Sequence, residues 1–150
     1  MSQPDDILLR PATAADRAVI WRMVRSEHLN PMGLDWRRFL LAVRASGKVV
    51  GCVQIKPHGD GTRELASLVV DKALRGSGLA RQLIETIRAG QDPPLYLMCR
   101  SSLEPLYARF GFRALSAEEM PGYYRRIYSL IHFMRFFARG SENLSIMKWE

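Results

Sequence analysis

The chain has 150 residues, of which 47% are hydrophobic and 25% are charged, values typical of one soluble globular domain with a hydrophobic core. The net charge of +7 is compatible with nucleic acid, an anionic surface or a polyanionic ligand, but the arginines are scattered and form no tract of the nucleic-acid-binding type. No apolar run reaches the ~20 residues of a membrane span and the first residues lack a signal-peptide pattern, so we expect a cytoplasmic protein.

The N-terminal part of the chain predicts a strand followed by a capped helix. Ile7–Arg10 has the pattern of a short strand. A helix is expected from Thr13 to about Arg25, because Thr13 with Asp16 three residues later matches a capping box. Residues 29–34 contain proline and glycine, which end this helix in a loop.

Two hairpins are predicted next. Trp36–Arg44 and Val49–Lys56 are rich in β-forming residues and are separated by a short turn. A second turn, at residues 57–61, leads into a strand that begins near Arg63. His58 lies in this second turn, so we expect a solvated turn histidine rather than a catalytic one.

The stretch Glu64–Gly90 carries the most specific pattern. An apolar run, Leu65–Val70, is followed by Arg75-Gly-Ser-Gly-Leu-Ala80 and then by apolar residues at helical spacing. A glycine turn at a helix N-terminus suits a phosphate group, because the first N–H groups have no partner inside the helix and glycine lets a ligand approach the backbone. A P-loop is excluded because no Lys-Ser/Thr follows Gly78, and a dinucleotide fingerprint is excluded because Arg81 occupies the third small position. Spacing alone leaves a phosphate site and an ordinary glycine turn as alternatives.

The C-terminal half predicts a strand, a short helix, a strand, an apolar helix and a final strand, at Leu95–Cys99, Ser102–Phe110, Phe112–Leu115, about residues 122–139 and Leu144–Trp149. The predicted helix at about residues 122–139 is so apolar that it needs cover on more than one side. Packing on the sheet, lining an acceptor pocket, joining a dimer and lying on a membrane surface all remain open for this helix.

The two cysteines, Cys52 and Cys99, lie in apolar strands and are expected to be reduced core residues without a disulfide or metal role.

Two motifs resemble those of the GCN5-related N-acetyltransferase (GNAT) superfamily. Arg75-x-x-Gly78-x-Ala80 matches the family signature Arg/Gln-x-x-Gly-x-Gly/Ala. Downstream, Leu103–Phe112 resembles the family's helix with its Tyr-x-x-x-Gly-Phe segment, in which the tyrosine is Tyr107. The two motifs occur in the family's order, and the resemblance covers about residues 7–115 and the final strand.

The resemblance implies an α/β (α+β) fold in one domain, residues 1–150: a central, mostly antiparallel sheet of six to seven strands, in which the parallel strands four and five splay apart, flanked by helices. It implies acetyl-CoA as cosubstrate and no metal. The pantetheine arm is then expected to pair with the fourth strand like an added strand. Arg100 stands where the family often has an asparagine that contacts CoA, and it is expected to meet a CoA phosphate instead. The other residues that the resemblance places at the cofactor are Leu68, Val69, Val70, Arg75, Gly76, Ser77, Gly78, Leu79, Ala80 and Arg81.

The resemblance also implies two catalytic side chains. Tyr107 corresponds to the family's tyrosine, which gives the departing thiolate a proton or a hydrogen bond; the alternative is a structural tyrosine. An amine with a pKa near ~10.4 must lose a proton before it attacks, so a base is useful. Glu64, at the start of the fourth strand, is the candidate base, because histone-type family members carry a glutamate there. An ordered water as base, with Glu64 as a surface residue, is the alternative.

The function that follows is an acetyl-CoA-dependent N-acetyltransferase, which transfers an acetyl group to a primary amine of a small molecule or peptide by direct attack in a ternary complex. In the family, the acceptor pocket is bordered by the regions that correspond to residues 29–34 and 116–140. The alternative is a non-catalytic CoA-binding or protein-interaction module on the same fold. No nucleic-acid partner is expected, and a homodimer is left open.

Overall fold

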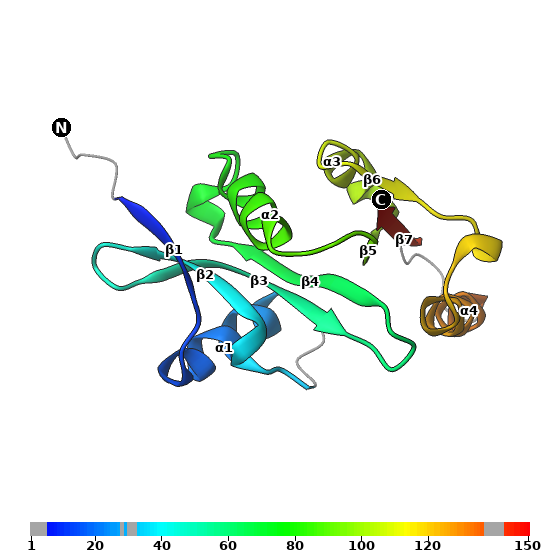
Figure 1. Ribbon diagram of the computed structural model, residues 1–150, viewed down its shortest axis with the longest axis horizontal. Coiled ribbons are helices and arrows are strands. Elements are labelled where there is room, and N and C mark those ends of the chain that lie inside the picture. The colour runs from blue at the N-terminus through cyan, green and yellow to red at the C-terminus, as the bar shows by residue number, and fades with distance from the viewer. Residues whose placement is uncertain (1–5, 28, 30–32, 137–142) are drawn as a thin grey trace. The chain divides into compact units, whose positions relative to one another are not determined.

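The structure, a computed structural model, describes residues 6–27, 29, 33–136 and 143–150. Within these residues the chain forms a seven-stranded sheet in the order β1-β2-β3-β4-β5-β7-β6 (Figure 1). The strands are β1 (Ile7–Pro11), β2 (Phe39–Arg44), β3 (Val49–Pro57), β4 (Arg63–Val70), β5 (Leu95–Arg100), β6 (Phe112–Ala114) and β7 (Leu144–Trp149). The α-helices in the same residues are α1 (Arg17–Ser26), α2 (Leu79–Ala89), α3 (Glu104–Ala108) and α4 (Gly122–Phe136). The pairs β1–β2, β2–β3, β5–β7 and β6–β7 are antiparallel, whereas β4 and β5 are parallel and pair at Glu64 and Tyr96. The predicted mixed sheet flanked by helices is confirmed.

The chain folds into two compact units, each made of two segments. Met1–Ile55 and Ala66–Gln91 form what we call the N-terminal unit. Lys56–Leu65 and Asp92–Glu150 form the C-terminal unit. Strand β4 contributes to both, since its first residues belong to the second unit and its last residues to the first.

The N-terminal unit buries both faces of its strands. Leu41 pairs with Cys52 in the ladder, and the next residue, Ala42, pairs with Gly51. Because neighbouring side chains alternate between the faces of a strand, these pairs point in opposite directions. Helix α1 covers the face that carries Leu41 and Cys52, through a buried cluster with Ile20 and Val24. Helix α2 covers the other face so closely that a Cβ atom on Gly51 would lie 3.0 Å from Leu83 Cδ1. Figure 1 shows the two helices on opposite sides of β2 and β3.

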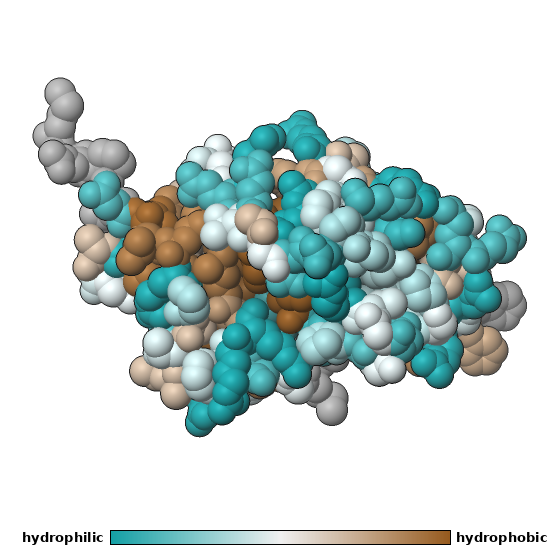
Figure 2. All heavy atoms as spheres, in the orientation of Figure 1, coloured by the Kyte–Doolittle hydropathy of each residue, from teal (hydrophilic) through white to brown (hydrophobic). Residues whose placement is uncertain are grey.

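One edge of the N-terminal unit exposes apolar surface. Strand β1 is the first strand of the sheet order, and its Leu8 side chain is 65% exposed. Figure 2 shows hydrophobic residues gathered on the part of the visible face where β1 and β2 lie in Figure 1. An edge strand with apolar side chains is a position at which proteins can associate.

The C-terminal unit is organised around the β5–β7 pair. Tyr124 of α4 is fully buried and stacks on Tyr96 of β5, with ring centroids 5.1 Å apart. Both tyrosines belong to a buried cluster that includes Ile146 of β7. Core packing is therefore what the structure shows for the first turn of the predicted apolar helix. Leu130, Phe133 and Met134, further along α4, are exposed, and residues 137–139 of the predicted helix lie outside the described residues.

Two predicted elements have different bounds in the structure. The predicted strand Trp36–Arg44 begins only at Phe39, because Trp36–Arg38 is a 3₁₀ helix. The Asp35 carboxylate caps this helix by accepting the Arg37 N–H at 3.0 Å, which is typical of aspartate at a helix start. The predicted helix Ser102–Phe110 is shorter, since Ser101–Leu103 is also a 3₁₀ helix and α3 spans only Glu104–Ala108.

The predicted capping box at Thr13 is present and includes an ion pair. Asp16 accepts the Thr13 N–H at 2.7 Å and two hydrogen bonds from Arg10, at 2.9 and 3.1 Å. The Arg10 guanidinium lowers the pKa of the buried Asp16 carboxyl to about 2, although burial alone would raise it. Because the folded-state pKa lies below the unfolded value, this stabilisation is present above about pH 4 and is lost as the pH falls toward 2.

Asp16→Asn is therefore expected to lower the free energy of unfolding at pH 7 by about 2 kcal/mol. Urea unfolding at pH 7 and at pH 3 measures the difference between the two proteins. The gap should narrow at the lower pH, because the Asp16 carboxyl of the unfolded wild type has the higher pKa and takes up a proton there first. A gap of equal size at both pH values would contradict the electrostatic origin of the effect.

Candidate functional site

The predicted phosphate turn lies in the N-terminal unit, between β4 and α2. After β4, the Asp71 side chain caps a 3₁₀ helix at Lys72–Leu74 by accepting the Ala73 N–H at 3.1 Å. Gly76 and Gly78 then adopt φ angles of +82° and +88°, in the left-handed region that favours glycine. Gly78 is the N-cap of α2, and the space around the Cβ position of both glycines is open. The turn therefore presents helix N–H groups to an anion without side-chain obstruction.

Two arginines flank this turn, and both are engaged on the surface. Arg75 Nη2 lies 3.1 Å from Glu27 Oε1, at the end of α1. Arg81 Nη1 lies 3.6 Å from Glu85 Oε1, one turn further along α2. Exposed pairs of this kind contribute roughly 0–1 kcal/mol, so a phosphate that carries formal charge can compete for either guanidinium. Leu79 is buried against the unit, and Ser77 and Ala80 complete the turn.

Strand β4 has a backbone kink just before the predicted pantetheine segment, Leu68–Val70. Ser67 adopts a φ of +55°, and it is the one non-glycine residue with positive φ among those that the structure describes. The kink is held from β3: Gln54 Nε2 donates to the Ser67 hydroxyl at 2.8 Å, and the Cys52 thiol donates to the Ser67 carbonyl at 3.4 Å. Left-handed backbone at a non-glycine residue costs roughly 1–2 kcal/mol, and such strain often occurs at functional sites. The sequence prediction did not include Ser67, although a serine inside the apolar run was a visible signal.

Replacing Ser67 by two different residues separates the strain from the hydrogen bond. Ser67→Ala and Ser67→Gly both remove the hydroxyl that pairs with the buried Gln54 amide, but only glycine relieves the positive φ. We therefore expect Ser67→Gly to be more stable than Ser67→Ala by about 1 kcal/mol. Thermal or urea unfolding of the two variants gives the difference directly. Equal stabilities would mean that the kink carries no strain at this position.

The predicted thiolate partner, Tyr107, lies in the C-terminal unit on α3. Its ring packs edge-on against Phe112, with centroids 6.3 Å apart. Burial, with a further contribution from Cys99, raises the pKa of Tyr107 to about 12. The phenol therefore keeps its proton at neutral pH and can donate a hydrogen bond. Arg100, at the end of β5, is exposed, as a phosphate-contacting residue would have to be.

Both cysteine thiols are unsuited to nucleophilic catalysis. Burial raises the pKa of Cys52 to about 12 and that of Cys99 to about 11. Since the thiolate is the nucleophile, neither side chain is activated for attack on a thioester. Across the described residues, no group of three or more His, Cys, Asp or Glu side chains could hold a metal ion.

The prediction that the His58 side chain is solvated was wrong. Its side chain is only 6% exposed, and its Nε2 atom lies 2.7 Å from Oε1 of Glu64, whose side chain is 8% exposed. The His58 ring stacks on Tyr123, with centroids 3.8 Å apart, and meets the edge of Tyr124 at 5.7 Å. Burial raises the pKa of Glu64, while His58 and Lys56 oppose the shift. The sequence hid this arrangement because the covering tyrosines lie more than sixty residues away along the chain.

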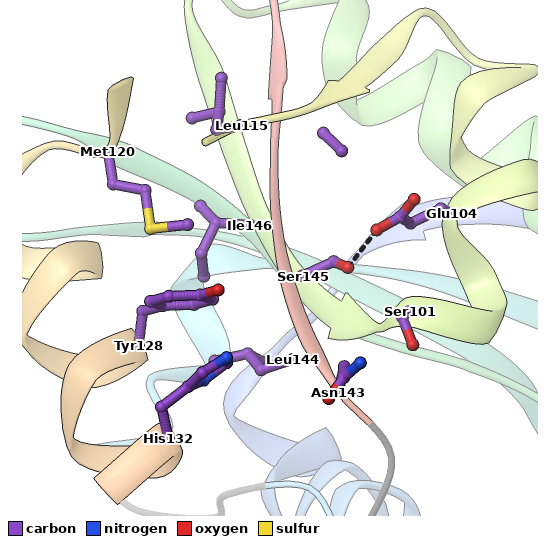
Figure 3. A pocket seen from close by; sticks show the side chains of 11 residues that line it. Ser101, Glu104, Leu115, Met120, Tyr128, His132, Asn143, Leu144, Ser145 and Ile146 are labelled. Carbon is purple, nitrogen blue, oxygen red and sulfur yellow. Dashed lines mark hydrogen bonds between the residues drawn. The ribbon is translucent and has the colours of Figure 1, made fainter. Parts of the chain in front are cut away.

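A separate cavity of about 230 Å³ lies elsewhere in the C-terminal unit (Figure 3). Figure 3 shows Tyr128 and His132 of α4 on one side of it, with Glu104 and Ser101 on the other. The Ser145 hydroxyl donates to Glu104, and the rings of Tyr128 and His132 are tilted by 31° with centroids 4.0 Å apart. None of the predicted catalytic or cofactor-binding residues lines this cavity, whereas Met120, Tyr128 and His132 come from the region 116–140 that is predicted to border the acceptor pocket. Its volume is below the roughly 300–1,000 Å³ of typical small-molecule sites.

Among the residues that the structure describes, no helix is both long enough and apolar enough to cross a membrane. The predicted loop at residues 29–34 is described only in part, since residues 30–32 lie outside the described residues.

Comparison with known proteins identifies the family of the chain. A model of the acetyltransferase (GNAT) domain matches residues 35–114. Mycothiol acetyltransferase of Mycolicibacterium vanbaalenii is 30% identical over 110 residues, which are 73% of this chain and 35% of that protein. The chain therefore spans about a third of the curated relative that it matches.

Two solved structures show how far the fold is shared. N-acetylglutamate synthase from Neisseria gonorrhoeae, complexed with coenzyme A and L-arginine, has a TM-score of 0.69 at 18% identity, over 95% of this chain and 33% of that chain. Rv2747 from Mycobacterium tuberculosis, in complex with CoA and NLQ, has a TM-score of 0.69 at 18% identity, over 95% of this chain and 98% of that chain. Similarity at this level of identity shows the fold. Because the family model covers more than half of the sequence, the chain belongs to the GNAT family of acetyltransferases.

Proposed function

We propose that the protein transfers an acetyl group from acetyl-CoA to a primary amine, by direct attack in a ternary complex. The observation that carries this proposal is the turn at Arg75–Ala80, with two left-handed glycines and an open N-terminus on an eleven-residue helix. CoA carries a pyrophosphate, which is the type of ligand that such a turn binds. Family membership and CoA-bound structural neighbours support the same donor.

The remaining cofactor contacts are assigned residue by residue. The backbone of Leu68–Val70 pairs with the pantetheine arm, and Arg75, Arg81 and Arg100 contribute charge to the phosphates. The Ser67 kink re-aims the backbone of β4 just before this segment, as bulges near active sites do. A backbone N–H there would hold the thioester carbonyl as it gains negative charge.

Two side chains serve the chemistry in this proposal. Tyr107 donates a hydrogen bond to the CoA sulfur as the C–S bond breaks, which its raised pKa favours by keeping the phenol protonated. The carboxyl of Glu64 belongs to the base that removes the proton from the acceptor amine, which its burial and raised pKa favour. The inertness of both buried cysteines supports direct transfer over an acetyl-enzyme.

The acceptor is a primary amine of a small molecule or a peptide. The neighbours suggest where a search should begin, since one is an N-acetylglutamate synthase and a relative is a mycothiol acetyltransferase. A panel should therefore contain the common amino acids, an amino sugar, a polyamine and short peptides with unblocked N-termini.

Calorimetric titration with acetyl-CoA, followed by this panel with detection of released CoA thiol, tests the proposal. We expect saturable binding and thiol release that depends on one class of amine. Absence of acetyl-CoA binding would refute the function. Binding without turnover by any amine would instead favour a CoA-binding or interaction module, for which the exposed Leu130, Phe133 and Met134 of α4 would provide a contact surface.

A further inference from the structure

The buried pair His58–Glu64 is a more specific arrangement than a single catalytic carboxylate. A charged carboxylate that is almost completely buried is costly unless a hydrogen-bonding partner replaces the water that it loses. The imidazole of His58 is that partner, with its Nε2 atom 2.7 Å from Glu64 Oε1. One of the two carboxylate oxygens of Glu64, Oε1, is therefore engaged by the imidazole.

The orientation of the imidazole is fixed by its neighbours. Tyr123 stacks on one face of the ring with an interplanar angle of 20°, and the ring of Tyr124 lies nearly perpendicular to it, at 88°. Tyr123 and Tyr124 are neutral phenols, since burial raises the pKa of both. The charged side chains around the pair are Lys56 and Asp60, which act on Glu64 and the two tyrosines over a longer range. Asp60 itself is occupied by Thr62 and by the Tyr123 N–H.

The chemistry of imidazole then decides which atom is basic. A neutral histidine that donates Nε2–H to a carboxylate carries its lone pair on Nδ1. A carboxylate in this position holds the tautomer and stabilises the imidazolium that forms when Nδ1 takes a proton, as in the base-and-orienter part of a hydrolytic triad. The His58 side chain is 6% exposed, so the transfer requires the amine, or one bridging water, to reach Nδ1 through that exposed part.

We propose that His58 is the base of the acetyl transfer, accepting the proton at Nδ1, and that Glu64 is a positioning residue that holds the Nε2–H tautomer. This inference rests on the proposed function and assigns the role of the base within it. The neutral amine nitrogen forms a bond to the thioester carbonyl carbon, and the C–S bond breaks with its electron pair leaving on sulfur. The N–H proton passes to Nδ1 of His58. A neutral amine and acetyl-CoA thus give an amide, a CoA thiolate and an imidazolium.

The first test is spectroscopic and does not require activity. The chain has three histidines, so nitrogen-15 spectra of the imidazoles are simple, and His58→Gln identifies the signals of residue 58. We expect the Nε2–H tautomer in the wild-type protein at neutral pH. In Glu64→Gln, the amide can donate to Nε2, so the tautomer should change to Nδ1–H. A wild-type His58 that is doubly protonated, or already Nδ1–H, would overturn the inference.

The second test is kinetic and uses the amine of the panel that gives the fastest thiol release. His58→Gln keeps a side chain that can donate to Glu64 but removes the base, so kcat should fall by about 10²- to 10⁴-fold with unchanged acetyl-CoA affinity. Glu64→Gln should lower kcat by a similar factor, and the double variant should be no slower than the single ones, because the two residues act as a unit. Glu150→Gln removes an exposed acidic group from the same unit and should stay within threefold of the wild type.

The outcomes separate the inference from the function on which it rests. If Glu64→Gln is inactive while His58→Gln keeps wild-type kcat, Glu64 itself is the base and the inference is wrong. If no amine supports thiol release by the wild-type protein, the proposed function fails, and the base assignment fails with it. In that case, the tautomer spectra still decide whether Glu64 orients His58.

Discussion

Gly78→Asp is expected to weaken acetyl-CoA binding by at least about 100-fold, which corresponds to about 2.7 kcal/mol. The substitution places a carboxylate where the proposed turn receives a pyrophosphate, at the N-cap of α2. Two unit charges 4 Å apart repel by about 4 kcal/mol at the effective dielectric constant of a protein surface, and solvent screening reduces only part of this. The new side chain also fills the open space above the backbone N–H groups.

The same substitution should leave the fold intact, which makes the binding result interpretable. Aspartate is among the preferred N-cap residues and its charge is favourable at a helix N-terminus. Aspartate also tolerates left-handed backbone better than most residues, so the φ of +88° costs it less than it would cost a bulky side chain. The melting temperature of Gly78→Asp should therefore stay close to that of the wild type.

Gly47→Asp is the matched control. Gly47 has a φ of +91° and open space around its Cβ position, but it lies in the turn between β2 and β3. It receives the same charge and the same strain without touching the proposed phosphate turn. Calorimetric titration of both variants with acetyl-CoA should show loss of affinity in Gly78→Asp alone. Equal affinities in the two variants would remove the phosphate assignment.

Tyr107→Phe is expected to lower kcat roughly 10- to 100-fold while the affinity for acetyl-CoA changes little. A hydrogen bond to a charged group is worth about 1.5–3 kcal/mol, and this one forms only as negative charge develops on sulfur. A phenol with a pKa of about 12 does not give its proton fully to a thiolate, whose conjugate acid has a pKa near ~8.5. In the proposed mechanism, Tyr107 is therefore a hydrogen-bond donor rather than a general acid.

The bound CoA thiol gives a direct readout of this role. A donor that stabilises the thiolate makes the bound thiol more acidic, so the ultraviolet absorbance of the thiolate should rise at lower pH in the wild type than in Tyr107→Phe. The ring contact with Phe112 is retained in the variant, so packing changes little. An unchanged kcat, or an unchanged titration of the bound thiol, would show that Tyr107 has a structural role only.

The parts of the site that the sequence predicts well are those whose geometry is local. The turn at Gly76 and Gly78 could be recognised because strand, glycines and helix follow one another directly, and the Thr13 capping box spans only four residues. The predicted start of β2 was wrong for a local reason as well. Asp35 can cap a 3₁₀ helix, and this signal competes with the strand pattern of the residues that follow. Once Asp35 is considered as a cap, the side chains of Trp36 and Arg37 give no reason to prefer a strand over a 3₁₀ helix at these positions.

The features that the sequence did not predict depend on residues that are distant in the chain. His58 is buried because Tyr123 and Tyr124 cover it, and no pattern within the turn reports their position. The left-handed conformation of Ser67 depends on hydrogen bonds from Cys52 and Gln54, on another strand. In both cases tertiary contacts override what the local residue types favour, which is common at functional sites.

The interleaving of the two units along the chain constrains the order in which the protein can fold during synthesis. The N-terminal unit has all of its residues once Gln91 has left the ribosome, even though it skips the segment Lys56–Leu65. His58 and Glu64 in that segment contact each other, but the ring contacts of His58 with Tyr123 and Tyr124 and the pairing of Glu64 with Tyr96 can form only after α4 and β5 are made. Contacts between residues that are distant in the sequence slow folding, because the entropy cost of closing the loop comes before the free energy gained from the contact. We therefore expect the nascent chain to form the proposed phosphate turn before the residues of the proposed base acquire their contacts with the two tyrosines.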